Sequence, residues 1–172
     1  MSTAHPTLDY SPQEERINAI THAAGALLAT VGSIALWQAA DSSLSNAQLA
    51  GLALYGGSLI LLFAASALYH YSQQPRLRVR LKQLDHAAIY GLIAGTYTPF
   101  LMISLDGSPK AEWLLMVLWL IALIGVIFKL FFIHRFAVIS LAAYLIMGWL
   151  VLLILPEIRQ ALAPHGFYLL VA

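Results

Sequence analysis

The stretch SALYHYSQQPRLRVRLKQLDHAAIYGLIAGTYTP, residues 66–99, decides the fold. An apolar run ends inside it with Ser66 and His70, whose i, i+4 spacing places both side chains on one face of a helix. A short basic segment follows, and a second apolar run then opens with Asp85 and His86. If both runs are membrane helices joined by a short loop, His70 and Asp85 lie at the same membrane surface and can meet. A serine, a histidine and an aspartate in that arrangement are able to bind a metal.

The composition is that of an integral membrane protein. Of the 172 residues, 60% are hydrophobic and 10% are charged, whereas a soluble domain carries about 25% charged residues. The formal net charge of +1 gives no basic field that would indicate a nucleic-acid partner, so the expected partners are membrane lipids. The absence of cysteine excludes disulfides and thiolate metal sites. The polar N-terminus lacks the basic-then-apolar layout of a cleaved signal peptide.

Five apolar segments are long enough to cross a hydrocarbon core of about 30 Å. The predicted spans are residues 17–40, 47–71, 84–104, 112–130 and 136–155, after a flexible tail at residues 1–16. Residues 166–172, GFYLLVA, are too few to span a bilayer, and we interpret them as the start of a sixth helix that is cut off. The predicted fold is an all-α polytopic transmembrane helix bundle of five complete spans and a stub.

Basic residues concentrate on one set of predicted loops. The loop after the first span has none, and the loop after the third has only Lys110. The loops after the second and fourth spans carry Arg76, Arg78, Arg80, Lys82, Lys129 and Arg135. Because positive loops stay in the cytoplasm, the N-terminus is predicted to be cytoplasmic. A basic cluster beside a membrane is also typical of anionic-lipid binding, although topology is its commoner meaning.

The third span contains a proline and a pair of glycines. Pro99 is predicted to kink or end the helix, because proline lacks a backbone N–H and clashes with the preceding turn. Gly91 and Gly95 form G-x-x-x-G, which predicts close packing on a neighbouring helix. Leu101 is expected to face lipid.

These motifs resemble the hemolysin III branch of the progestin and adiponectin receptor (PAQR) superfamily. The residues that carry the resemblance are Glu15, Asn18, Thr21, His22, Gly25, Ser66, His70, Leu84, Asp85, His86, Gly95, Tyr97, Thr98 and Pro99. The resemblance implies a seven-helix architecture whose last span supplies an H-x-x-x-H pair of zinc ligands. This sequence has no such pair, so we predict that it lacks the last two spans and binds zinc weakly or not at all.

The resemblance also implies roles for individual residues. It identifies His70 as a zinc ligand, Asp85 as a general base that acts through a water, and Ser66 as a hydrogen-bond donor. Hydrolysis of lipid amides or esters is the chemistry that it implies, as in the ceramidase-like receptors. The remaining polar residues are expected to form a supporting network, namely Glu15, Asn18, His22 and His86.

Simpler interpretations remain open beside these roles. Asp85 near a helix N-terminus could cap that helix, and His70 could be an interfacial residue. Three functions also compete: a zinc-dependent lipid hydrolase, a non-enzymatic membrane-homeostasis or receptor-like protein with structural metal, and a membrane-permeabilising hemolysin. The last has little support, because no predicted span carries a continuous polar stripe that would line a pore. The expected location is the bacterial inner membrane.

Overall fold

The computed structural model describes residues 10–132 and 137–171, and this part of the chain consists of helices joined by short connections, with no β-strand. Four helices are long and apolar enough to cross a membrane, and a fifth crossing is reached if a pair of helices bent by 54° counts as one span. The chain therefore folds as the predicted all-α polytopic bundle. The first nine residues of the predicted tail, the predicted start of the fifth span at Phe136 and Ala172 lie outside the described residues.

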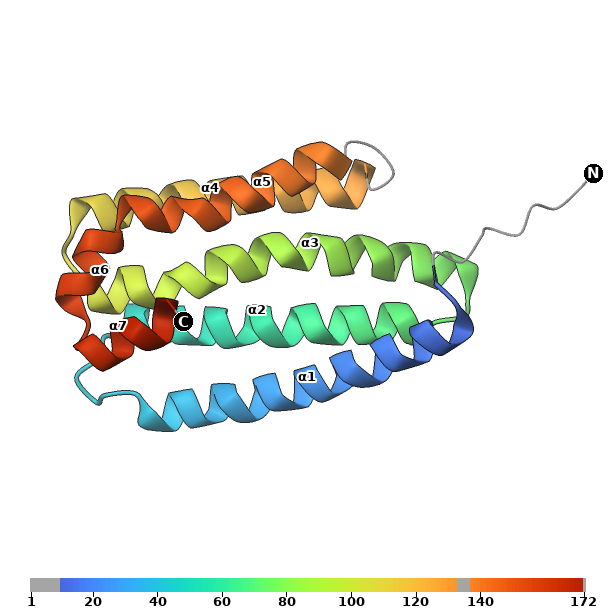
Figure 1. The fold of residues 1–172 in the computed structure, drawn as a ribbon, viewed down its shortest axis with the longest axis horizontal. Helices are drawn as coiled ribbons and strands as arrows, with labels where there is room; N and C mark the ends of the chain where they lie inside the picture. Colours follow the sequence, from blue (N-terminus) through green and yellow to red (C-terminus); the bar gives the residue numbers. More distant parts are fainter. Residues whose placement is uncertain (1–9, 133–136, 172) are drawn as a thin grey trace, which may run out of the picture.

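Three long helices run antiparallel to one another in chain order (Figure 1). They are α1 (Pro12–Ala39), α2 (Asn46–Tyr71) and α3 (Pro75–Pro99). The Ser11 hydroxyl caps α1 by accepting from the Glu14 N–H, and the Glu14 carboxylate accepts from the Ser11 N–H at 2.7 Å. Ser45 and Gln48 form the same capping box at the start of α2. α1 begins at Pro12, so the helix starts five residues before the predicted first span.

The basic segment after α2 is helical, which corrects the prediction of a basic loop. α3 begins at Pro75, so the connection to α2 shrinks to residues 72–74. The basic residues occupy the first turns of α3 because proline is favoured at the first helical position and arginine, leucine and lysine are good helix formers. Hydropathy indicates where a chain leaves an apolar environment, and a helix can continue beyond that point.

Pro99 ends α3 as an α-helix, as predicted. The chain continues as a π-helical turn, η1 (Phe100–Ser104), and then enters α4 (Pro109–Phe132). Of the two glycines before Pro99, Gly95 lies against Ser58 of α2, and a Cβ at this position would clash with the Ser58 hydroxyl. Gly91 has open space around its Cβ position, so the predicted close packing holds for Gly95 alone. Leu101 is only 3% exposed, and the expectation that it faces lipid was wrong.

The last part of the chain runs back along α4 and then bends across one end of the bundle (Figure 1). It consists of α5 (Ala137–Trp149), the 3₁₀ turn η2 (Leu150–Leu153), α6 (Leu155–Ala161) and α7 (Pro164–Val171). Pro156 lies in the first turn of α6. Where α5 ends, the Tyr97 hydroxyl lies 2.9 Å from the Met147 carbonyl and 2.8 Å from the Gly148 carbonyl, so it donates to carbonyls near the end of the helix that lack a partner in the next turn.

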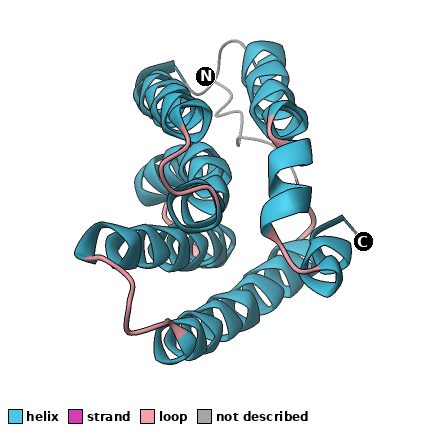
Figure 2. Ribbon diagram, turned by 90° about the vertical axis from the view of Figure 1, so that its left-hand side faces the viewer, coloured by secondary structure: helices cyan, strands magenta, loops and turns pink. Residues whose placement is uncertain are grey.

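The main apolar core lies between α3, η1, α4 and the segments that follow α5. Its fully buried members include Leu114, Leu118, Met147, Ile154 and Ile158. Figure 2 shows the long helices nearly end-on, with α1 at the margin of the bundle. α1 accordingly leaves large apolar side chains such as Leu27, Leu28 and Val31 exposed, as a lipid-facing helix does.

Candidate functional site

A small pocket lies where three helices meet at one end of the bundle. The first turns of α1, the last turns of α2 and the first half of α3 come together there (Figure 1). The pocket has a volume of about 290 Å³ and is lined by His22, Leu62, Phe63, Ser66, His70, Asp85 and Ile89. Four polar side chains therefore share one apolar-walled pocket, and they come from three different helices.

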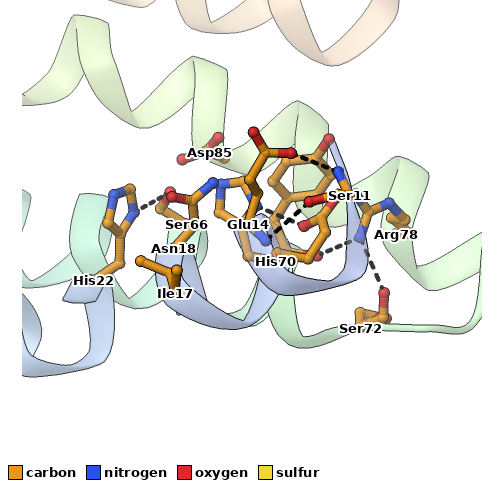
Figure 3. Close-up of polar contacts among 12 residues, drawn as sticks. Ser11, Glu14, Ile17, Asn18, His22, Ser66, His70, Ser72, Arg78 and Asp85 are labelled. Carbon is orange, nitrogen blue, oxygen red and sulfur yellow. Dashed lines mark hydrogen bonds and ion pairs between the residues drawn. The ribbon is translucent and has the colours of Figure 1, made fainter. Parts of the chain in front are cut away.

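A short hydrogen bond joins α1 to α2 inside the pocket. His22 Nδ1 lies 2.5 Å from Ser66 Oγ, and Ser66 itself is buried (Figure 3). The contact is possible because both residues face the same helix interface, where the ring of His22 also packs edge-on against Phe63. The Ser66 hydroxyl is thus held at the pocket wall by an imidazole and is available there as a donor or acceptor.

A second polar link joins the same two helices one turn closer to their ends. His70 Nδ1 lies 2.7 Å from one carboxylate oxygen of Glu15, and the guanidinium of Arg78 pairs with the other oxygen (Figure 3). The side chains of Glu15 and His70 are about nine-tenths buried. An ionised carboxylate can only accept hydrogen bonds, so the proton in the His70 contact belongs to Nδ1.

Arg78 of α3 completes this link and was absent from the predicted site. Its guanidinium donates to the carbonyls of Tyr69 and Ser72 at 3.2 Å and 3.3 Å, which are among the last carbonyls of α2. It also lies over the Tyr69 ring, 4.5 Å from the ring centre. The sequence holds a signal for this role: Arg78 precedes Asp85 by seven residues, so both share a face once the segment is known to be helical.

Asp85 lies deeper in the bundle than the sequence suggested. Because α3 begins at Pro75, Asp85 lies about three turns into the helix, or roughly 15 Å along it. The interpretation of Asp85 as a helix cap is therefore wrong. Its side chain is 16% exposed and lines the pocket opposite residues of α1 and α2.

Three of the predicted supporting residues, Glu15, Asn18 and His86, lie outside the pocket lining. His86 Nδ1 lies 3.0 Å from the Lys82 carbonyl, to which it donates, and 3.7 Å from a carboxylate oxygen of Asp85. Asn18 contributes its backbone carbonyl, which accepts from the Thr21 hydroxyl at 3.1 Å. The catalytic, ligand and network roles drawn from the sequence remain predictions for all of these residues.

A zinc ion would require more ligands than this pocket offers. Structural zinc takes four ligands, and catalytic zinc takes three plus water. His70 suits one ligand position, because a carboxylate on one ring nitrogen is typical of a histidine that binds metal through the other. Within residues 10–132 and 137–171, no group of three or more His, Cys, Asp or Glu side chains is placed to hold a metal ion. The described residues thus fit one ligand position and not a complete zinc site.

Comparison with known proteins gives the family. The family model described as Haemolysin-III related matches residues 10–171. Hemolysin-3 of Bacillus cereus is 42% identical over 160 residues, which cover 93% of this chain and 73% of the relative. A Hemolysin-3 homolog of Bacillus subtilis is 38% identical over 161 residues, covering 94% of this chain and 75% of the relative.

A more distant relative is a human protein. The human Monocyte to macrophage differentiation factor is 29% identical over 141 residues, which cover 79% of this chain and 58% of the relative. No solved structure gives a significant match. With its apolar helices and its match over nearly the whole sequence, the chain belongs to the Haemolysin-III related family and is an integral membrane protein.

Proposed function

We propose that this protein is a membrane-embedded hydrolase scaffold for lipid amides or esters, and that zinc is the metal of its site. One observation carries the proposal: His70, Asp85, Ser66 and His22 line a single pocket with an apolar wall. An acidic, a basic and a hydroxyl group in one water-poor pocket are the group types used in acyl-transfer chemistry. Leu62, Phe63 and Ile89 make the rest of the lining apolar, which suits a lipid substrate.

Each polar side chain has a role in this proposal. His70 offers Nε2 as a metal ligand, since Nδ1 is engaged by Glu15. Asp85 is the general base, and Ser66, held by His22, donates a hydrogen bond to the substrate carbonyl. Zinc, when bound, supplies Lewis acidity and lowers the pKa of water. Because the described residues provide an incomplete ligand set, we expect the 172-residue chain to hold zinc weakly or not at all.

The proposed location is the bacterial inner membrane with a cytoplasmic N-terminus. The support is the positive charge of the first turns of α3, at the end of the bundle where α1 also begins. This orientation places the pocket toward the cytoplasmic side. Reporter fusions at Gln74 and at Ser43, which lie in successive connections, should be found on opposite sides of the membrane. Two reporters on the same side would contradict this topology.

Zinc titration and lipid turnover test the proposal directly. The purified chain in detergent micelles is titrated with zinc against a competing chelator and is then assayed with a fluorescent ceramide and a matching ester. Any zinc binding should be weak, should be weakened further by His70→Ala and should be unchanged by the exposed His165→Ala. Any turnover with excess zinc should be lost in Asp85→Asn and kept in the exposed Asp106→Asn.

The alternatives predict different results. Zinc binding that depends on His70, without turnover of either lipid, would favour the receptor-like protein with structural metal. Release of an entrapped dye from liposomes would favour the permeabilising protein. Zinc binding that His70→Ala does not change would overturn the assignment of the ligand.

A further inference from the structure

Lys129, near the end of α4, is a buried cation that the proposed function does not use. The residue is only 3% exposed. It continues the buried face of α4, to which Leu118 and Ala122 also belong at helical spacings. An apolar side chain is the ordinary occupant of such a position, because burying an ammonium group away from water is costly unless an anion pairs with it.

Lys129 has no ion-pair partner in the part of the chain that the structure describes. Gln83 marks the face of α3 that is turned toward the end of α4, because its side-chain amide donates to the Leu130 carbonyl at 2.8 Å. Asp85, the acidic residue of α3, lies two residues further and hence about 200° round the helix. Its carboxylate lines the pocket formed with α1 and α2 and leaves Lys129 unpaired.

Two common roles of a lysine near a helix end do not account for this burial. A lysine that snorkels keeps its ammonium group in water, whereas Lys129 is almost fully covered. Side chains of an α-helix tilt toward its N-terminus, and α4 ends three residues after Lys129, so this side chain starts out toward the interior of the bundle. A lysine in the last turn also complements the helix dipole, but that interaction is available to an exposed lysine.

The position of Lys129 in the bundle suits contact with a lipid headgroup. One helical turn deeper, a Cβ at Gly125 would clash with the ring of Tyr90, and that ring contacts the ring of Tyr144 with the centres 4.5 Å apart. Lys129 therefore lies on the membrane-surface side of these rings, in the last turn of α4. Phe131, two residues further, is 74% exposed, as a side chain in contact with acyl chains is.

We propose that Lys129 binds the phosphate of an anionic membrane phospholipid at the junction of α3, α4 and α5. The lipid supplies the negative charge that the described residues do not, and its acyl chains pack on exposed apolar side chains such as Phe131. The exposed Arg80 lies one turn before Gln83 on the same face of α3, and it adds a second positive charge nearer the membrane surface. This lipid site involves neither zinc nor hydrolysis.

The site is tested by thermal unfolding of the delipidated full chain in neutral detergent micelles. Phosphatidylglycerol is the probe, and phosphatidylcholine with the same acyl chains is the control, because its phosphate is already paired with a choline cation. At a lipid concentration about 100 times the Kd, we expect phosphatidylglycerol to raise the Tm by about 5–10 °C. Phosphatidylcholine should raise it much less, and equal rises with the two lipids would overturn the proposal.

The variant Lys129→Met removes the charge and keeps an unbranched apolar stem. We expect it to abolish the rise with phosphatidylglycerol while the Tm without lipid equals or exceeds that of the wild type, since no ammonium group is then buried unpaired. A rise that persists in Lys129→Met would overturn the proposal. A Lys129→Met protein less stable than the wild type without lipid would also overturn it, by showing that the ammonium group has its partner within the protein.

A matched control separates a defined site from general attraction between cations and anionic lipid. Arg16 is an exposed cation in the first turns of α1, at the same end of the bundle, and Arg16→Gln should keep the full rise. Loss of the rise in Arg16→Gln as well would overturn the proposal in favour of diffuse electrostatic attraction. Arg80→Gln should weaken phosphatidylglycerol binding about five-fold, as removal of one cation near a membrane surface does, and unchanged binding would overturn the part given to Arg80.

The last arm distinguishes a lipid headgroup from a free phosphate. Inorganic phosphate carries the same charged group without acyl chains, and we expect it to leave the Tm unchanged. A rise with inorganic phosphate as large as that with phosphatidylglycerol would overturn the assignment to a lipid. Native mass spectrometry of the same samples should show phosphatidylglycerol retained on the wild type and on Arg16→Gln, and absent from Lys129→Met. Equal retention on Lys129→Met would overturn the proposal.

Discussion

The two halves of the bundle are held together by different interactions. Between α3, η1, α4 and the segments after α5, fully buried apolar side chains interlock in one core. Between α1, α2 and α3, the pocket end instead relies on a few polar contacts, from His22 to Ser66 and from Glu15 to His70 and Arg78. In lipid, polar contacts between helices substitute for the hydrophobic effect, which gives little reason for one apolar helix to prefer another.

This contrast between an apolar core and a polar helix interface indicates where reactive side chains can be placed in a membrane protein. An interlocked apolar core is specified by shape and has no polar group to offer a substrate. A polar interface fixes side chains of defined charge in defined orientations, because each unsatisfied group would be costly away from water. The pocket is accordingly found at the interface that polar contacts hold, and the apolar half serves as its support.

The largest expected effect is at Glu15, which connects both helices to Arg78. Glu15→Ala leaves Arg78 and His70 buried without their partner, and removing one member of a buried ion pair costs about 3–5 kcal/mol. Thermal unfolding of the protein in detergent, followed by circular dichroism, measures the loss. Glu112→Ala, at an exposed acidic position in the first turn of α4, is the matched control and should change stability little. A Glu15→Ala protein as stable as this control would show that the pocket end does not depend on its polar contacts.

A smaller effect is expected in the apolar half. Leu118 is fully buried in the core, so Leu118→Ala leaves a cavity and should cost about 2–5 kcal/mol. Leu120, 55% exposed on the same helix, is the control, and Leu120→Ala should cost much less in the same unfolding experiment. A Leu118→Ala protein as stable as Leu120→Ala would show that the buried apolar side chains do not hold this half together, and the contrast between the two halves would fail.

Much of the fold follows from the sequence because it depends on local physics. The length of each apolar run, the turn after Pro99 and the shared helix face of Ser66 and His70 come from spacing alone. Approximate membership of the pocket also followed, because His70 and Asp85 lie on adjacent helices joined by one short connection, although Asp85 lies about three turns into α3. The start of α3 was missed, since hydropathy detects the change from apolar to charged residues and a helix can extend across it.

The sequence by itself determined that this is a helical membrane protein, which polar side chains are candidates for chemistry, and on which helices they lie. Only the tertiary structure decided that Gly95 packs against α2 while Gly91 does not, and that Leu101 is buried. It also decided that Arg78, alone among Arg76, Arg78 and Arg80, turns toward Glu15. The physical reason is that lipid and protein core are both apolar, so composition cannot distinguish a lipid-facing residue from a packed one. Likewise, a charged side chain such as Arg78 of α3 finds its partner on another helix, here Glu15 of α1, and the sequence around Arg78 does not specify that partner.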